Sequence, residues 1–306
     1  MCGIIGFQGE EDVQPILLSG LKKLEYRGYD SAGIAVLGDN GLSIGKKAGK
    51  IKNLEKKLRN DPLKGRVGIG HTRWATHGPP TKNNAHPHQD CNKEIALIHN
   101  GIIENYRPLK KGLLSRGHKI TSQTDTEVLA HLIEEEKGSL TERVRKSLRR
   151  VEGSFAVAVI SVNEPDTIVA ARKGSPLVMG TKKNGTTGML ASDVPAILDY
   201  TRDIIFLHDD QVAALKKGEI EVENFQGESV EPERRHIDWD PVSARKEGYK
   251  HFMAKEINEQ PRSVGDTIRG EDEELLMDEG EITEEEIKKV DKIFILACGT
   301  SYYAGM

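Results

Sequence analysis

Short apolar runs separated by turn residues dominate the middle of the sequence. The longest, Gly153 to Ile160, is continuous, which is typical of a strand buried on both faces. Runs at residues 2–7 and 34–37 also have the length of strands, and Asp39-Asn40-Gly41 after the second predicts a hairpin turn. Six further strands are predicted at Asp166–Ala171, Leu177–Gly180, Met189–Ser192, Ile204–Leu207, Val212–Leu215 and Ile220–Asn224.

Helical periodicity flanks these runs. An amphipathic helix that ends near Tyr26 is predicted by the spacing of Val13, Ile16, Leu17, Leu21 and Leu24. Basic helices are predicted at Ile51–Arg59 and Leu140–Arg150. Residues 124–127 (Thr-Asp-Thr-Glu) have the form of a capping box, which predicts that another helix begins there. Strands in the middle with helices in pairs around them favour an α+β fold of layered sheets over regular βαβ alternation.

The composition shifts toward charge near residue 240. Beyond it the sequence predicts a helix over Met253–Ile268, kinked or broken at Pro261, and an acidic solvated segment at 271–286. Residues 292–297 predict an apolar strand that runs into a polar turn at 298–301. A strand and a turn cannot form a domain. We therefore expect a domain at 1–240, a linker with helices at 241–291, and at 292–306 the beginning of a truncated α/β domain.

Charge and cysteine content narrow the classes of function. The 306 residues hold 44 basic and 48 acidic side chains, spread through the chain, with a formal net charge of −4. No basic stripe for nucleic acid and no polybasic membrane anchor is present, so small soluble substrates are expected. The sequence shows no apolar run that could span a bilayer and no signal peptide, which predicts a cytoplasmic protein. Because Cys2, Cys91 and Cys298 lie far apart without a C-x-x-C motif, neither disulfides nor a cysteine-based zinc site is expected.

Cys2 is the first candidate for chemistry. Removal of Met1 would expose a residue that carries both a thiol and a free α-amine, with pKa values of about 8.5 and about 7.7 to 8.0. The amine could then take the proton of the thiol, so one residue would supply nucleophile and base. Taken alone, Cys2 is better explained as the first buried residue of a strand, and the residues that follow along the chain reverse this preference.

A histidine-rich stretch follows in the first third of the chain. Five of the ten histidines fall between His71 and His99. None of them forms an i, i+4 pair typical of helical metal ligands, and the prolines indicate a loop, so a polar substrate loop is favoured over a metal site. In it, the forked guanidinium of Arg73 suits a carboxylate, and Trp74 offers a large apolar lid.

Four further residues, at three places in the chain, are open to two interpretations. Asn100-Gly101 after an apolar strand is typical of a type I′ hairpin turn, but its amide and backbone N–H could also form an oxyanion hole. Asp125 could stabilise a helix start, bind a substrate ammonium, or both. Arg27 could pair with Asp30 at the surface or lie beside Cys2, and spacing does not decide between these positions.

Several short motifs occur here in one order: Cys2-Gly3-Ile4, residues 27–31 (RGYDS), 71–78 (HTRWATHG), 84–88 (NAHPH), 99–101 (HNG) and 124–127 (TDTE). This ordered set resembles the N-terminal glutaminase domain of the isomerising glutamine–fructose-6-phosphate aminotransferases. The resemblance covers roughly residues 1–240 and resumes at 255–261 and 295–301. RGYDS favours this family over the related phosphoribosyl-pyrophosphate amidotransferases. The resemblance implies an N-terminal-nucleophile hydrolase fold, a four-layer αββα sandwich.

The resemblance also implies roles for individual residues. Cys2 would attack the side-chain amide of glutamine, and Asn100 and Gly101 would hold the oxyanion. Arg73 would bind the α-carboxylate and Asp125 the α-ammonium. The remaining implied residues are Thr76, His77 and His86 in the glutamine loop, Trp74 as a gate for ammonia, Arg27 as support, and Cys298, Gly299, Thr300 and Ser301 at the beginning of a sugar-phosphate site.

The implied reaction needs no metal and no cofactor, because a thiolate with two donors for the oxyanion suffices for acyl transfer. Its partners would be L-glutamine and, in a complete enzyme expected to be a homo-oligomer, fructose 6-phosphate, which is converted to glucosamine 6-phosphate. The present chain is expected to act as a glutaminase only. The alternatives are a free-standing glutaminase subunit, a catalytically silent glutamine sensor, or, more remotely, a histidine-rich metal protein.

Overall fold

The computed structural model describes residues 2–182, 185–238, 249, 251–268, 288–292, 294–297 and 300–306. The chain divides into two compact units, Met1–Ala244 and Arg245–Met306, which are described separately.

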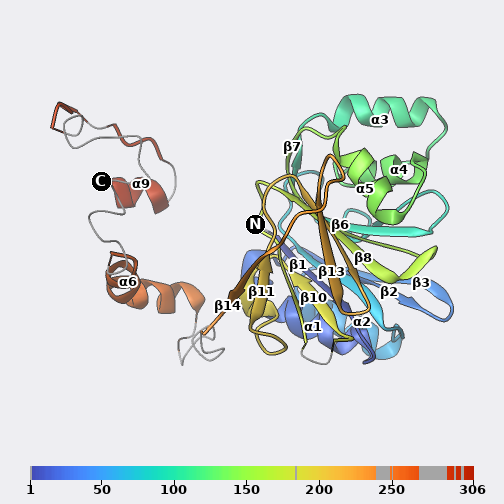
Figure 1. The fold of residues 1–306 in the computed structure, drawn as a ribbon, viewed down its shortest axis with the longest axis horizontal. Coiled ribbons are helices and arrows are strands. Elements are labelled where there is room, and N and C mark those ends of the chain that lie inside the picture. The colour runs from blue at the N-terminus through green and yellow to red at the C-terminus, as the bar shows by residue number, and fades with distance from the viewer. Residues whose placement is uncertain are drawn as a thin grey trace. The chain divides into compact units, whose positions relative to one another are not determined.

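Two antiparallel sheets form the centre of the first unit (Figure 1). The eight-stranded sheet has the order β14 (Glu233–His236), β11 (Asp203–Phe206), β9 (Val178–Thr181), β10 (Gly188–Ala191), β1 (Gly3–Gln8), β4 (Val67–Arg73), β2 (Ser31–Gly38), β3 (Gly41–Ala48). The six-stranded sheet has the order β13 (Glu219–Asn224), β12 (Gln211–Lys216), β8 (Glu164–Lys173), β7 (Gly153–Ser161), β6 (Ile95–Ile103), β5 (His88–Gln89).

Helices cover the outer face of each sheet. Helices α1 (Val13–Lys23) and α2 (Ile51–Asn60) pack on the eight-stranded sheet, where short 3-10 turns lie at Glu25–Arg27 and Val194–Ala196. Helices α3 (Tyr106–Ser115), α4 (Glu127–Glu135) and α5 (Leu140–Leu148) cover the six-stranded sheet on the opposite side (Figure 1). The order helix, sheet, sheet, helix is the expected four-layer αββα arrangement.

The alternation of side chains along the strands separates three cores. In β1, Ile5 and Phe7 face the helices, while Ile4 points between the sheets. In β7, Phe155, Val157 and Val159 face the helical layer, whereas the alternate positions, two of them alanines, fill the space between the sheets. This period of two is what the strand geometry requires.

Most predicted elements are present, including all six of the later strands. Of the two interpretations of Asn100-Gly101, the hairpin turn is wrong, because β6 continues through both residues and pairs Gly101 with Phe155 of β7. The capping box predicted at 124–127 is also wrong. Thr126 makes no side-chain cap, and the Glu127 carboxylate instead accepts from the backbone N–H groups of Thr121 and Ser122. The predicted elements do not include β4, β5, α3 and β14.

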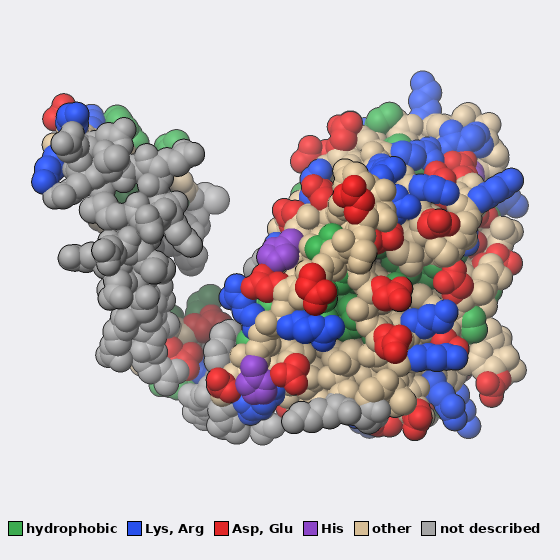
Figure 2. Space-filling view, in the orientation of Figure 1, with side chains coloured by type: hydrophobic (Ala, Val, Ile, Leu, Met, Phe, Trp, Pro, Cys, Tyr) green, Lys and Arg blue, Asp and Glu red, His purple; other side chains and the backbone are tan. Residues whose placement is uncertain are grey.

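The second unit contains two described helices, α6 (Phe252–Ile268), which continues through Pro261, and α9 (Thr300–Gly305). Residues 294–297 form no strand, and the side chain of Leu296 is 96% exposed. The strand predicted there is therefore wrong, because no described segment pairs with it. None of the described helices has the length and apolarity needed to cross a membrane. On the face shown in Figure 2, acidic and basic side chains of the first unit are interspersed.

Candidate active site

A cavity of about 290 Å³ opens where the ends of β1, β4 and β6 meet. The described residues that line it are Cys2, Arg27, Arg73, Trp74, Thr76, His86, His99, Asn100, Gly101, Ile102, Thr124, Asp125, Thr126, Ser154, Ser175 and Pro176. Most of the candidates from the sequence are therefore in one place, although they come from strands and loops that are far apart along the chain.

Cys2 lies at the start of β1 with its thiol at the cavity. Its Sγ accepts a hydrogen bond from the backbone N–H of Trp74 at 3.2 Å. Burial raises the pKa of the thiol, and this hydrogen bond opposes that rise by favouring the thiolate. The strand can approach β4 closely because Gly3 has no side chain: a Cβ there would lie 2.6 Å from Oγ1 of Thr72.

The carbonyl oxygen of Cys2 is held from two sides. Nε of Arg27 donates to it at 3.2 Å and Nδ2 of Asn100 at 2.9 Å. Arg27 is itself fixed by an ion pair with Asp193, 3.0 Å long. The structure thus places Arg27 beside Cys2, and the surface pairing with Asp30 that the sequence left open does not occur. Oδ2 of Asp30 instead accepts from the backbone N–H of Ala75 at 2.6 Å.

Asn100 and Gly101 reach the same point from the other sheet. The ring of His71 fixes the Asn100 amide, since its Nε2 lies 3.0 Å from both Oδ1 of Asn100 and the carbonyl oxygen of His99. Both partners are acceptors, so Nε2 of His71 carries the proton. Gly101 has φ 125°, and a Cβ on it would lie 2.0 Å from the carbonyl oxygen of Ser154. Only glycine fits this position.

Arg73 ends β4 and organises the loop that follows. Its guanidinium donates to the carbonyl oxygens of His77, Gly78 and Pro79, the last two at 3.1 and 3.3 Å. These three bonds use three of its five N–H donors. Burial lowers the pKa of Arg73, and the nearby Cys2, Asp30 and Asp125 oppose that shift.

The other candidates of the glutamine loop divide into two groups. Thr76 and the buried ring of His86 line the cavity, and the His86 ring stacks on His71 at a centroid distance of 4.1 Å. The side chain of His77 does not line it, and its ring packs against Tyr106 at 5.3 Å. Trp74 is 44% exposed at the rim, where Tyr29 contacts it edge to face.

Asp125 lies at the back of the cavity just before α4. The residue is 4% exposed, and its Oδ2 accepts from the backbone N–H of Ile103 at 2.8 Å. Its position therefore depends on β6, the strand that also carries Asn100. The Asp125 carboxylate could stabilise a helix start and bind a substrate ammonium at the same time, but in this structure it does not cap α4.

Sequence reasoning missed several cavity residues. His99, Ser154, Ser175 and Pro176 line the cavity but are not among the candidates from the sequence, and His71, which orients Asn100, is predicted only as part of a motif. No local pattern marks Ser175-Pro176. For the predicted sugar-phosphate site, Cys298 and Gly299 lie outside the described residues, and the backbone of Thr300 and Ser301 begins α9.

Comparisons with known proteins agree with this geometry. A family model described as a glutamine amidotransferase domain matches residues 71–199. The chain is 47% identical over 310 residues to the isomerising glutamine–fructose-6-phosphate aminotransferase of Clostridium acetobutylicum and 50% identical over 314 residues to that of Thermotoga maritima. Each match covers all of this chain and 51% of the relative, so the chain spans about half the length of the curated relatives it matches.

Solved structures agree at the level of the fold. The glutamine phosphoribosylpyrophosphate amidotransferase of B. subtilis matches 73% of this chain and 49% of its own chain, with a TM-score of 0.64 and 27% identity. A class-II glutamine aminotransferase domain protein from Silicibacter pomeroyi matches with a TM-score of 0.51 and 14% identity over 73% of this chain and 99% of its own.

The two facing sheets, with the cysteine at the start of β1, have the N-terminal-nucleophile fold of class II glutamine amidotransferases. Over its whole length the chain is similar to the isomerising glutamine–fructose-6-phosphate aminotransferases, and residues 71–199 match the glutamine amidotransferase domain.

Proposed function

We propose that this chain hydrolyses the side-chain amide of L-glutamine to glutamate and ammonia, with Cys2 as the nucleophile. The observation that carries the proposal is the convergence on Cys2: the Asn100 amide lies 2.9 Å from its carbonyl oxygen, while its thiol faces a cavity that Arg73 and Asp125 also line. The two charged residues match the opposite charges of the α-carboxylate and the α-ammonium of glutamine.

In the proposed reaction, removal of Met1 gives Cys2 a free α-amine. That amine takes the thiol proton, the sulfur attacks the amide carbon, and the amine returns the proton to the departing ammonia. The Asn100 side-chain N–H and the Gly101 backbone N–H stabilise the oxyanion of the tetrahedral intermediate. Water then releases glutamate from the thioester. This sequence of steps requires neither a metal nor a cofactor.

The surrounding residues have supporting roles in this proposal. Arg27 orients the Cys2 backbone, and Thr76 and His86 shape the pocket for glutamine. His77 is proposed to act through its backbone carbonyl, which Arg73 binds, because its ring does not line the cavity. Trp74, exposed at the rim, is proposed as the gate for ammonia.

The names of the relatives support a second step in which the ammonia reaches fructose 6-phosphate and gives glucosamine 6-phosphate. We propose this step for an enzyme of the relatives' full length, with Cys298, Gly299, Thr300 and Ser301 at its sugar-phosphate site and a homo-oligomeric assembly. For the 306-residue chain we propose the glutaminase reaction. A glutamine sensor or a free-standing glutaminase subunit remains the competing interpretation.

Labelling by an electrophilic glutamine analogue tests the nucleophile. Intact-mass analysis should show a chain that lacks Met1, and 6-diazo-5-oxo-L-norleucine should add once, at Cys2. Cys91→Ser should be labelled like the wild type and Cys2→Ser should not. An active chain that retains Met1 would contradict the proposed base. A processed Cys2 that binds glutamine without releasing glutamate would favour the sensor.

A further inference from the structure

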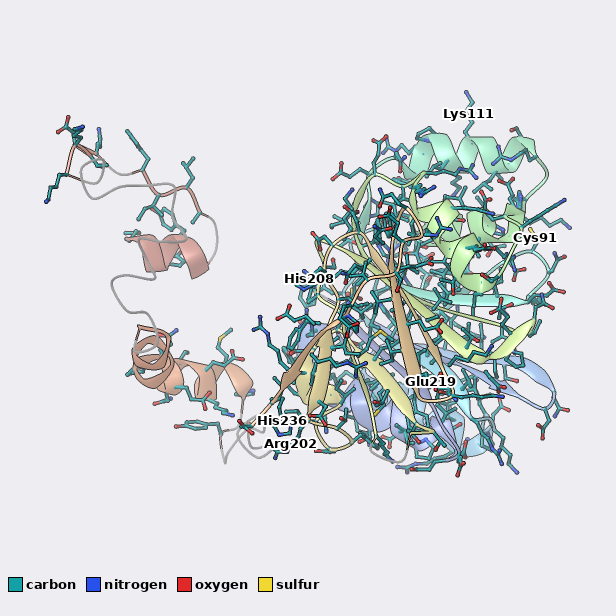
Figure 3. The ribbon with its side chains drawn as sticks, viewed as in Figure 1. Cys91, Lys111, Arg202, His208, Glu219 and His236 are labelled. Atoms are coloured by element: carbon teal, nitrogen blue, oxygen red, sulfur yellow. The ribbon has the colours of Figure 1, made fainter. Side chains whose placement is uncertain are left out.

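Four metal-ligating side chains come together on the helical side of the six-stranded sheet, away from the cavity. They are Cys91 in the turn between β5 and β6, His118 in the loop after α3, and His131 and Glu134 on α4. Figure 3 labels Cys91 beside the helical layer. One atom from each, Sγ, two Nδ1 and one carboxylate oxygen, lies within 4.8 Å of all the others. We propose that these four residues bind a structural zinc ion.

Five of the six distances between the ligand atoms are close to the edges of a tetrahedron around zinc. Zinc bonds of about 2.0–2.1 Å to nitrogen and about 2.3 Å to sulfur give edges of about 3.3 Å between two nitrogens and about 3.6 Å between nitrogen and sulfur. In the structure the two Nδ1 atoms are 3.3 Å apart, and they lie 3.6 and 3.5 Å from Sγ of Cys91. Oε2 of Glu134 is 3.0 and 3.1 Å from the two Nδ1 atoms, a few tenths of an ångström short of its expected edge.

Residues around the cluster hold the ligands as a zinc site requires. Nε2 of His118 lies 3.1 Å from Oε1 of Glu135, and Nε2 of His131 lies 3.9 Å from Oε1 of Glu127. Both histidines thus have Nδ1 at the centre, and Nε2 of His118 has a carboxylate within hydrogen-bond distance, the usual outer partner of a zinc-bound imidazole. The backbone N–H of Lys119 donates to Sγ of Cys91 at 3.4 Å, and Asn92 donates to the second oxygen of Glu134 at 3.0 Å.

A hydrogen-bonded network without metal explains this arrangement less well. Both nitrogens of His118 face carboxylate oxygens, so without metal both would have to carry protons. Nδ1 of His131 also faces Oε2 of Glu134, at 3.1 Å, so without metal it too would carry a proton, and two Nδ1–H groups would lie 3.3 Å apart. A zinc ion removes this conflict, because each Nδ1 lone pair binds the metal and each Nε2–H faces a carboxylate. A thiolate and a carboxylate also balance the two charges of Zn²⁺.

Four protein ligands leave no position open for a substrate, which distinguishes a structural site from a catalytic one. The ion would tie the β5–β6 turn to α4. The segment just before α4 carries Asp125, and β6 carries Asn100, so the zinc site would stabilise two walls of the cavity from outside. A cysteine-based site is not expected from the sequence, because Cys2, Cys91 and Cys298 lie far apart without a C-x-x-C motif. The histidine partners of Cys91 lie 27 and 40 residues after it, outside the histidine-rich stretch that ends at His99.

Metal analysis of the full chain, purified without a histidine tag, tests the proposal. We expect one zinc per chain after dialysis against zinc and then metal-free buffer. Replacement by Co²⁺ should give the visible absorption of a tetrahedral site with a thiolate-to-cobalt band. The thiolate band should be lost in Cys91→Ser and retained in the matched control Cys2→Ser. His118→Gln, whose ring is on a loop, should reduce zinc content at least tenfold while the chain stays folded.

A chelator should lower the melting temperature of the wild type and leave that of folded Cys91→Ser unchanged. A wild-type chain that retains no zinc, and whose melting temperature responds to neither zinc nor chelator, would show that the cluster is only a hydrogen-bonded network. Zinc that persists in Cys91→Ser but disappears in Cys2→Ser would place the ion in the cavity and overturn the assignment.

Discussion

Nε2 of His71 donates to Oδ1 of Asn100 over 3.0 Å, and the same Asn100 amide donates to the carbonyl oxygen of Cys2 over 2.9 Å. His71 is fully buried and does not line the cavity. It therefore acts on the reaction through the orientation of Asn100, whose N–H must point toward the oxyanion. A rotated amide would present its oxygen to a negative charge.

We expect His71→Leu to reduce kcat for glutamine hydrolysis by on the order of 10- to 100-fold, equivalent to about 1.4 to 2.8 kcal/mol. KM should change little, because His71 contacts neither charged end of the proposed substrate. Steady-state kinetics measure both values. His88→Leu, a second buried histidine that does not contact Asn100, controls for the loss of a buried ring. Equal losses in the two variants would assign the effect to packing.

The same His71→Leu variant should change how the free energy of unfolding depends on pH. Burial lowers the pKa of His71 to about 3, from an ordinary value of 6.5. Between these values the unfolded chain binds a proton that the folded chain does not, so His71 destabilises the fold as the pH falls from 6.5 to 3. The slope is up to about 1.4 kcal/mol per pH unit for one proton.

Urea unfolding measured at several pH values should show this contribution in the wild type and not in His71→Leu. The difference in free energy of unfolding between the two should therefore shrink as the pH falls through this window. A constant difference between wild type and His71→Leu would mean that His71 titrates alike in both states.

The sequence predicts the features of this structure that follow from local patterns, and it does not predict those that depend on contacts between distant residues. The alternation in β1 and β7 decides which side chains point to which core, and a resemblance based on short ordered motifs brings Cys2, Arg73 and Asn100 into one site. The Asn100-Gly101 dipeptide is open to two interpretations, because a hairpin turn and a positive-φ position inside a strand favour the same residues. Only the pairing of Gly101 with Phe155 distinguishes the two.

Residue pairs that are distant in the chain escaped prediction for a related reason. The partners of Glu127 are backbone groups of Thr121 and Ser122, whose approach depends on how the loop before α4 folds. The approach of Cys91 to His118 and His131 depends on the packing of α4 against the β5–β6 turn. Neither the contacts of Glu127 nor those of Cys91 produce a periodic pattern in the sequence.

Substitution of Gly101 tests whether the backbone at this position requires a residue without a side chain. In Gly101→Ala, the new Cβ would lie 2.0 Å from the carbonyl oxygen of Ser154. The alanine would also have to adopt a φ of 125°. We expect the free energy of unfolding to fall by at least about 2 kcal/mol, and glutaminase activity to fall with it. Gly41→Ala is the matched control, because Gly41 has φ 86° and no atom near its absent Cβ. If the two variants lose equal stability, the cost lies in φ alone and not in the contact with β7.

The final prediction concerns Arg73, whose guanidinium has two functions. It holds the carbonyl oxygens of residues 77–79, and it has two further donors with which to grip a carboxylate in the cavity. Lysine retains the charge but cannot reproduce this fork. Arg73→Lys should therefore lower kcat/KM for glutamine by the equivalent of about 1.5 to 3 kcal/mol, the scale of a charge-assisted hydrogen bond.

A second substrate separates the two functions. 4-Aminobutanamide is glutamine without its α-carboxylate, so a residue that binds this carboxylate should discriminate between the two compounds and Arg73→Lys should discriminate much less. Arg172→Lys, at a part-buried arginine outside the cavity, should keep the discrimination of the wild type. If Arg73→Lys slows both substrates by the same factor, Arg73 acts only by holding the loop, and the proposed carboxylate contact must be assigned to another residue.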